Sequence, residues 1–267
     1  MQRKGRHRPT IEEAVEISGI ETLHPGGFAL TRRTAQLAGL RPGLKVLDVS
    51  SGRGTQACYY AQEFGVQVSG VDLSPSMVAA AATAAGKAGL SDRVRFRIGD
   101  SQDLPFPSDG FDVAINECAV GIPDDPQLVL NEMVRVVRPG GVVAIHESTW
   151  RQTLEAAEKD DLTERYGTTP QTREEWHAML VQAGVAEIIV ESDPWSRPEM
   201  FWKIRQDRDV AKPSQVLHPY ERLRAAVRIH RRYGLRGVWK VFENERVFFR
   251  AVQAGKLGYC LFKGVKA

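Results

Sequence analysis

The sequence predicts a doubly wound α/β fold, in which helices cover both faces of a mostly parallel sheet. Short apolar segments that fit buried strands alternate along the chain with longer segments that have helical spacing. Three of the apolar segments end in an acid, at Asp48, Asp72 and Asp100. A turn that contains Gly52 and Gly54 follows the first of them, as expected between a buried strand and a helix.

The turn after the first strand predicts a cofactor site. Gly52 and Gly54 let the backbone approach a ligand closely, and the helix that follows offers free N–H groups to an anion. The same residues fit the dinucleotide pattern G-x-G-x-x-A, with Asp72 at the spacing of a ribose-binding acid. Asp48 would repel a pyrophosphate, however, and would attract a cationic amino group. The strand end therefore favours a ligand with a cationic, amino-acid-like group.

Composition limits the kind of protein. The 267 residues, 42% of them hydrophobic, suffice for one substantial core. The basic N-terminus precedes no apolar run, and no segment approaches membrane-spanning length, so we expect a soluble, cytoplasmic protein. The net charge of +3 is too small to indicate a nucleic-acid partner, and we interpret the basic excess from Lys203 to Arg250 as a solvated face. Three widely spaced cysteines predict neither a disulfide framework nor a structural zinc site.

The N-terminal 40 residues predict an arm with two helices. A capping box at Thr10 to Glu13 starts the first, which is expected to end near Ser18, and Phe28 to Leu40 predicts the second. His24 lies in the turn cluster between them, where a surface imidazole is expected.

The second and third strands end at the same edge as the first. The segment from Val66 to Asp72 alternates and then delivers an acid, which is placed to accept hydrogen bonds from both hydroxyls of a ribose. Ser74 and Pro75 begin the next helix, which continues to Ala88. The third strand, 94–98, leads to Asp100.

The remaining regular elements follow in order. Strands are predicted at 111–116, 142–147, 185–191 and 256–263, and helices at 126–138 and 172–183. The segment from Trp150 to Gln171 is expected to be irregular.

At this point the sequence resembles the class I S-adenosylmethionine (AdoMet) methyltransferases. The acid followed by a glycine turn matches their first motif, with Ser50 in place of the first glycine. Residues 131–141 are very similar to their segment E-x-x-R-V-L-K-P-G-G, and the likeness covers roughly residues 20–191 plus the last strand. The resemblance implies a Rossmann-like sheet of seven strands with the last antiparallel, and AdoMet as cofactor. The implied cofactor site comprises Asp48, Ser50, Gly52, Gly54, Asp72, Leu73, Asp100, Ser101 and Asn116.

The strand order implies a domain organisation. We expect an N-terminal arm with lid helices at 1–40, an AdoMet-binding domain at 41–191, a helical cap inserted at 192–255 and the final strand at 256–267. A parallel strand leaves the sheet at its carboxyl edge and an antiparallel strand enters there, so the insertion should project over the ligand-binding edge. A small-molecule acceptor enclosed under this cap is the expected substrate.

Side chains at the ends of the fourth and fifth strands are the candidate catalytic groups. His146 is a possible base, Glu117 and Glu147 are possible ligands for a cationic amine, and Cys118 is a possible soft nucleophile. No spaced acid cluster supports a metal site, so no metal is predicted.

Three alternatives remain open. The segment from Asp112 to Cys118 is similar to arsenite methyltransferases, in which a cysteine after the fourth strand binds the metalloid. The glycine pattern also suits an NAD-type oxidoreductase. A non-catalytic AdoMet-binding module is the third possibility. The methyl acceptor and the oligomeric state are left open, with a homodimer possible.

Overall fold

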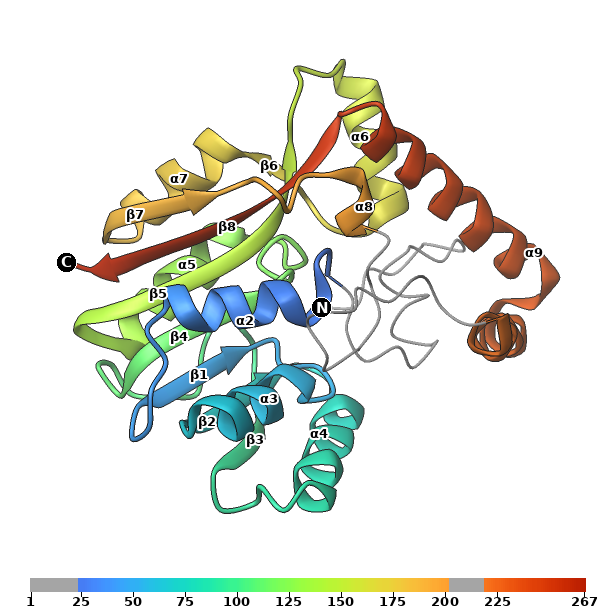
Figure 1. Ribbon diagram of the computed structural model, residues 1–267. Coiled ribbons are helices and arrows are strands. Elements are labelled where there is room, and N and C mark those ends of the chain that lie inside the picture. Colours follow the sequence, from blue (N-terminus) through green and yellow to red (C-terminus); the bar gives the residue numbers. More distant parts are fainter. Residues whose placement is uncertain (1–23, 202–218) are drawn as a thin grey trace.

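A computed structural model describes residues 24–201 and 219–267, and it confirms the doubly wound α/β fold. The sheet has the strand order β3-β2-β1-β4-β5-β8-β7, with a short β6 paired to β5 (Figure 1). Pairing is parallel from β3 to β5, whereas β8 runs antiparallel between β5 and β7. The strands are β1 (Lys45–Val49), β2 (Gln67–Asp72), β3 (Val94–Ile98), β4 (Phe111–Glu117), β5 (Val137–Trp150), β6 (Gln171–Thr172), β7 (Val185–Glu191) and β8 (Leu257–Lys266).

Helices connect these strands. Local signals start three of them: Ser74 caps α4 by accepting from the backbone N–H of Met77, Asp125 caps α5, and Thr172 forms a capping box at α7. The helices are α2 (Gly27–Leu37), α3 (Thr55–Phe64), α4 (Pro75–Lys87), α5 (Pro126–Val136), α6 (Ala156–Tyr166), α7 (Arg173–Gln182), α8 (Pro198–Phe201) and α9 (Pro219–Gln253). None of these described helices is long and apolar enough to cross a bilayer.

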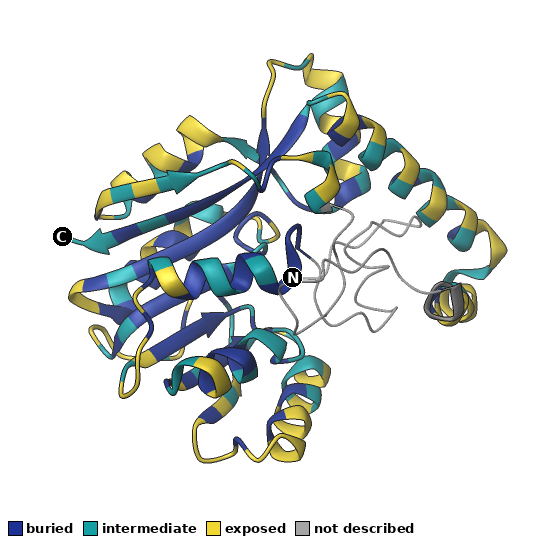
Figure 2. Ribbon diagram, viewed as in Figure 1, coloured by how far each residue is buried: buried dark blue, intermediate teal, exposed yellow. Residues whose placement is uncertain are grey.

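Two apolar layers cover the sheet. On one face β1, β4 and β5 pack against α5 and α7 around Met133, Trp176 and Phe262. On the other face the same strands pack against α2, α3 and α4 around Tyr60, Val46 and Ile115. The central strands β1, β4, β5 and β8 are therefore the most deeply buried part of the sheet, and polar groups at their ends are held by a rigid frame (Figure 2).

Two segments differ from the sequence-based prediction. Strand β5 is longer than 142–147 at both ends, because Val137 pairs with Phe111 of β4 and β8 pairs with β5 from Val142 to Trp150. The segment expected to be irregular contains helix α6, whose Leu162 and Tyr166 are buried although the helix is mostly polar. Tertiary burial of this narrow apolar face stabilises a helix that the sequence pattern signals weakly. The helix predicted from Thr10 to Ser18 lies outside the described residues.

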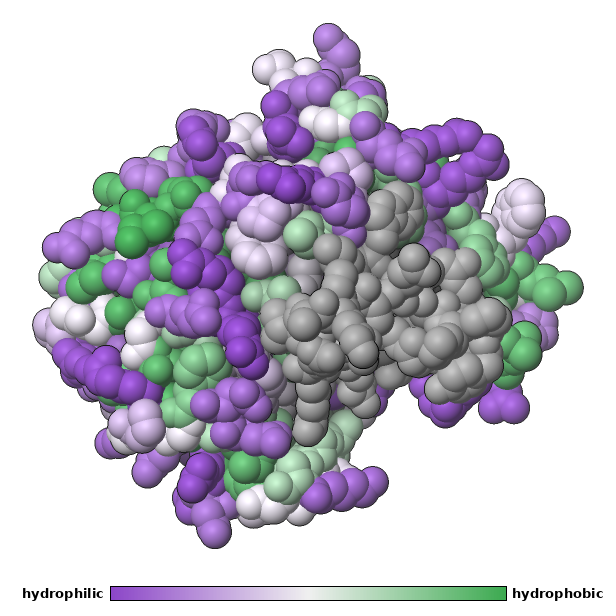
Figure 3. All heavy atoms as spheres, viewed as in Figure 1, coloured by the Kyte–Doolittle hydropathy of each residue, from purple (hydrophilic) through white to green (hydrophobic). Residues whose placement is uncertain are grey.

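Between β7 and β8 the described chain forms α8 and α9. Helix α9 bends at Gly234, whose φ of 68° and ψ of −174° are not helical. Its C-terminal part joins a third apolar cluster with α2, α6 and β8, which includes Leu30, Trp150, Leu162 and Val252. Its outer part exposes Leu235 and several arginines, and apolar residues gather at that end in the space-filling view (Figure 3).

Candidate active site

The turn between β1 and α3 has the left-handed backbone that a glycine-rich loop requires. Ser50, Gly52 and Gly54 have φ values of 60°, 51° and 73°. Ser50 therefore adopts the conformation of the glycine that it replaces in the family pattern, at the steric cost of a Cβ atom.

Gly52 and Gly54 have different surroundings. A Cβ atom on Gly52 would meet none of the described residues within 4 Å, so its surroundings suit close approach of a ligand. A Cβ atom on Gly54 would lie 2.4 Å from the ring of Phe96 and 2.8 Å from Cβ of Ala81. Gly54 is thus required by the packing of α3 against β3 and α4, a role that the sequence pattern did not reveal.

Asp48 ends β1 as a buried acid without a full set of partners. Its side chain is 3% exposed, and within the described part of the chain Oδ2 has no hydrogen-bond partner. Burial raises the pKa of Asp48 well above its ordinary value, and the charges of Glu117 and Asp72 raise it further. The hydroxyl of Ser51, also buried, has no partner among the same residues. A buried acceptor and hydroxyl left unpaired in this way fit a cationic ligand group.

Asp72 organises the turn beside it. Its Oδ2 accepts from the backbone N–H of Gly52 at 2.8 Å, and its Oδ1 accepts from that of Ser74 at 2.9 Å. Leu73, next in the chain, is 65% exposed. A carboxylate beside an exposed apolar side chain suits the ribose and base of a nucleoside.

At the end of β3 the chain turns tightly around Asp100. Its Oδ1 accepts from the backbone N–H of Gln102 at 2.9 Å, and an isolated bridge links it to Asp103. Ser101 is buried beside it. Asp100 thus follows the carboxyl end of β3, and its carboxylate fixes the turn there.

The side chains of Asn116 and Glu147 form hydrogen bonds to backbone groups. The amide of Asn116 donates to the carbonyl oxygen of Val49 at 3.1 Å and accepts from the N–H of Ala119 at 2.9 Å. Glu147 is 1% exposed and accepts from the N–H of Val120 at 2.6 Å. Both side chains therefore shape the loop after β4. Because successive residues of a strand face opposite sides, Glu147 is separated from its neighbour His146.

Glu117 and His146 meet a third residue that the sequence analysis placed elsewhere. Nε2 of His24 lies 2.9 Å from Oε2 of Glu117, and Nε2 of His146 lies 3.3 Å from the same oxygen. The expectation of a surface imidazole at His24 is wrong, because this side chain is 2% exposed. The turn predicted there is present, but α2 packs over the sheet and carries the turn inward.

Charge and hydrogen bonds reinforce this cluster. Burial alone would raise the pKa of Glu117, but His146 and His24 outweigh it and leave that pKa below its usual range. Burial lowers the pKa of His146. The hydroxyls of Tyr60 and Thr31 both donate to the carboxylate. No sequence pattern links these residues, since they belong to α2, α3, β4 and β5.

Cys118 follows the cluster with a left-handed φ of 66° and is half-buried against the third apolar cluster. Burial and the neighbouring Cys118 both raise the pKa of Tyr259. In the described part of the chain, donor atoms of His24, Glu117 and His146 converge as metal ligands would. No cysteine belongs to this group.

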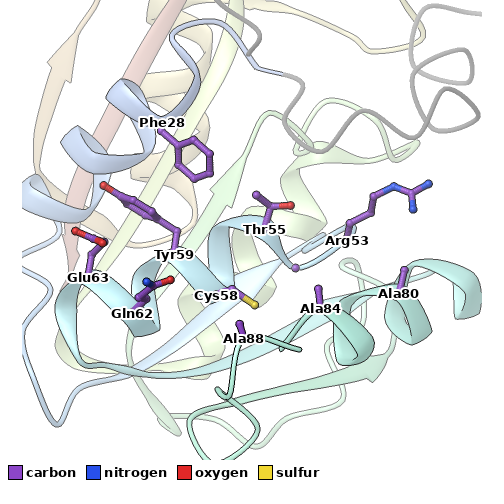
Figure 4. Close-up of a pocket in the computed structure, with 11 residues that line it drawn as sticks. Phe28, Arg53, Thr55, Cys58, Tyr59, Gln62, Glu63, Ala80, Ala84 and Ala88 are labelled. Atoms are coloured by element: carbon purple, nitrogen blue, oxygen red, sulfur yellow. The ribbon is translucent and has the colours of Figure 1, made fainter. Parts of the chain in front are cut away.

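A separate open pocket of about 330 Å³ lies between α3 and α4, beneath Phe28 of α2 (Figure 4). Arg53, Tyr59 and Glu63 line one side, and Ala80 and Ala84 of α4 with its C-cap Ala88 line the other. Gly54 also borders this pocket, but none of the acids at the strand ends does, so we distinguish it from the cofactor site.

The strand order and the acids at the carboxyl edge define a class I methyltransferase architecture. Residues 47–145 match the family described as "Methyltransferase domain". Methyltransferase GfsG of Streptomyces halstedii is 36% identical over 139 residues, which are 52% of this chain and 50% of that protein. The chain thus spans half the length of this curated relative.

Solved structures share the whole fold. The cyclase SpnF superimposes with a TM-score of 0.72 at 22% identity, with 97% of each chain covered. Phosphoethanolamine N-methyltransferase 2 of Haemonchus contortus, solved with phosphomonomethylethanolamine and S-adenosylhomocysteine, gives 0.70 at 21% identity and covers 97% of this chain and 58% of that one. The family match over residues 47–145, the curated relatives and the solved neighbours support a class I AdoMet-dependent methyltransferase domain with AdoMet as its cofactor, as the sequence motifs indicated.

Proposed function

We propose that this protein transfers the methyl group of AdoMet to a small-molecule acceptor held between the sheet edge and the segments that cover it. The observation that carries the proposal is Asp48, a buried carboxylate with an unpaired oxygen among the described residues, next to a left-handed turn. A buried charge of this kind needs a partner, and the ammonium group of AdoMet supplies one.

The other proposed contacts run along the cofactor from its amino-acid part through the ribose to the base. Ser50, Gly52 and Ser51 would face the amino-acid part, Asp72 the ribose, and Leu73 with Asp100 and Ser101 the base. Support comes from the open space at Gly52, the position of Asp72 at the end of β2 and the exposed side chain of Leu73. Gly54 and Asn116 would act indirectly, by keeping the turn and the β4 loop in place.

The acceptor pocket would be walled by the arm and by the insertion at 192–255. The backbone N–H of Gly26, just before α2, donates to the carbonyl oxygen of Met200 in α8 at 2.9 Å. Arg33 of α2 donates to both carboxylate oxygens of Glu191 at the end of β7. The third apolar cluster packs α2, α6 and α9 together, so these segments form one continuous unit.

AdoMet supplies an electrophilic methyl group, so the protein's main task is to align the acceptor and to exclude water. We assign that alignment to Glu117, His146 and Cys118, which lie at the ends of β4 and within β5. Glu147 supports them by fixing the loop at Val120.

The alternatives are not favoured. The comparisons match methyltransferases, which disfavours an NAD-type oxidoreductase. A metalloid methyltransferase that uses Cys118 would need further thiol ligands. The converging side chains in the described chain, those of His24, Glu117 and His146, include no cysteine. Measurements of AdoMet binding and of methyl transfer distinguish a non-catalytic AdoMet-binding module from an enzyme.

Calorimetry with AdoMet, S-adenosylhomocysteine and NADH tests the cofactor. We expect the first two to bind and NADH to be silent. Labelled AdoMet incubated with metabolite fractions, followed by mass spectrometry, then tests transfer. Failure of both sulfur nucleosides to bind would reject the proposal. Tight binding without methyl transfer to any fraction would favour the non-catalytic module.

A further inference from the structure

We propose that His24, Glu117 and His146 form a binding site for a divalent first-row transition-metal ion. The three residues come from the turn before α2, the end of β4 and the middle of β5. One donor atom of each lies within 4.8 Å of the other two. The inference does not depend on methyl transfer, since it rests on the geometry of this cluster.

The separations suit a common ion. Imidazole nitrogens and carboxylate oxygens bind such metals at about 2.0–2.2 Å, so ligand atoms around one ion lie roughly 3–3.5 Å apart. Oxygen Oε2 of Glu117 is 2.9 Å from Nε2 of His24 and 3.3 Å from Nε2 of His146. The donor atoms of the two histidines lie within 4.8 Å of each other, so the imidazoles would close around a common ion by side-chain movement.

Each ligand is oriented by an outer partner. Nδ1 of His24 lies 3.1 Å from the carbonyl oxygen of Pro25, and Nδ1 of His146 lies 2.8 Å from the hydroxyl of Tyr259. Histidine ligands in metal sites are usually held through the second ring nitrogen in this manner, which directs the first toward the ion. The hydroxyls of Tyr60 and Thr31 fix the carboxylate of Glu117 in the same way.

An unpaired buried nitrogen provides a second, independent observation. The side chain of His146 is 0% exposed, and its Nε2 makes no hydrogen bond within the described structure. This nitrogen lies 3.3 Å from Oε2 of Glu117, but the contact lacks hydrogen-bond geometry. Buried polar atoms rarely remain unpaired, and a metal ion at the centre would satisfy this nitrogen.

The ligand chemistry indicates the class of ion. Two imidazoles with one carboxylate suit zinc, iron, cobalt or manganese, whereas magnesium and calcium prefer sites made only of oxygen. The proposal departs from the sequence-based expectation of no metal, because His24 was placed at the surface there and only two of the three ligands were grouped together.

The test uses the full chain after treatment with a chelator. Co²⁺ is added while the visible absorption is recorded, and Zn²⁺ is titrated by calorimetry. We expect one equivalent of each ion to bind, Zn²⁺ to displace Co²⁺, and Zn²⁺ to raise the melting temperature. Absence of cobalt absorption bands from bound ion in the wild-type chain would overturn the proposal without any variant.

Variants locate the site. His24→Ala, Glu117→Gln and His146→Ala should each weaken Zn²⁺ binding by more than the roughly 10- to 100-fold typical of losing an outer partner. Tyr259→Phe, at a positioning residue, should weaken it by about 10-fold and shift the cobalt spectrum. His177→Ala, at an exposed histidine of α7, is the matched control and should bind normally.

Circular dichroism verifies that each variant is folded. If a folded His24→Ala or Glu117→Gln variant binds Zn²⁺ with wild-type affinity and an unchanged cobalt spectrum, the three residues form only a buried charge cluster. AdoMet binding, measured on the same metal-free samples, reports separately on the proposed methyltransferase function.

Discussion

Nε2 of His24 lies 2.9 Å from Oε2 of Glu117, and this contact joins the N-terminal arm to the end of strand β4. The side chains are only 2% and 4% exposed, so the pair is sealed beneath α2. Glu117 in turn raises the pKa of Asp48 through its charge, which couples the cluster electrostatically to the cofactor side of the sheet edge. The arm is therefore part of the site.

Asp48→Asn is predicted to weaken AdoMet binding by about 10- to 100-fold. A hydrogen bond to a charged partner contributes roughly 1.5–3 kcal/mol, and about 1.4 kcal/mol corresponds to a factor of ten. Stability should be unchanged or higher, because the substitution removes a buried acid with an unpaired oxygen in the described structure. Calorimetry and thermal melting measure the two effects, and wild-type affinity in the variant would contradict our assignment of Asp48.

AdoMet binding by the wild-type chain should tighten as pH rises from the ordinary pKa of an aspartate, about 3.9, toward the raised pKa of Asp48. Below this raised pKa the free protein holds a proton on the carboxyl group, and the cationic ligand favours its release. Measurements should stay below pH ~7, where the amino group of the ligand remains charged. Asp48→Asn should remove this dependence, and a variant that retains it would assign the titration to another group.

The raised pKa of Asp48 also affects the stability of the free protein, which should fall as pH rises, whereas AdoMet binding should tighten. Because the folded state binds the proton more tightly than the unfolded state, the stability that Asp48 contributes is present below its unfolded pKa and is lost as pH rises through its folded pKa. Denaturant unfolding of the wild-type chain without ligand should show this decline, and Asp48→Asn should flatten it.

Gly54→Ala is predicted to destabilise the fold by about 2–4 kcal/mol. The new Cβ would overlap the ring of Phe96, and the left-handed backbone adds strain. Gly89→Ala is the matched control, with a φ of 68° and no described atom within 4 Å of a new Cβ. It should cost only about 1 kcal/mol. Equal losses in denaturant unfolding would show that packing at Gly54 is unimportant.

Leu73→Ala is predicted to weaken AdoMet binding about 3- to 10-fold without changing the melting temperature. The side chain is 65% exposed in the free protein, so its apolar surface becomes buried only against a ligand. Leu128→Ala, at a 45% exposed leucine of α5, is the control for the same chemical change and should bind normally. An unaltered affinity in Leu73→Ala would place the base elsewhere.

The sequence determined the sheet and the approximate cofactor edge. Alternating strand and helix patterns, with acids at Asp48, Asp72 and Asp100, are local signals, and carboxyl ends of neighbouring parallel strands meet at one edge. The structure confirms the doubly wound fold, and the comparisons support the methyltransferase family and its cofactor. The left-handed turn at Ser50 was also encoded locally by its glycine-rich neighbours.

Tertiary structure decided which polar residues meet. Strand alternation separated Glu147 from His146, backbone hydrogen bonds occupied Asn116, and the packing of α2 brought His24 to Glu117. These outcomes depend on contacts between residues distant in the chain, for which hydrophobic periodicity and turn residues carry no signal. A sequence pattern specifies the direction and end of each element, whereas the burial of one element on another fixes the partners of its polar side chains.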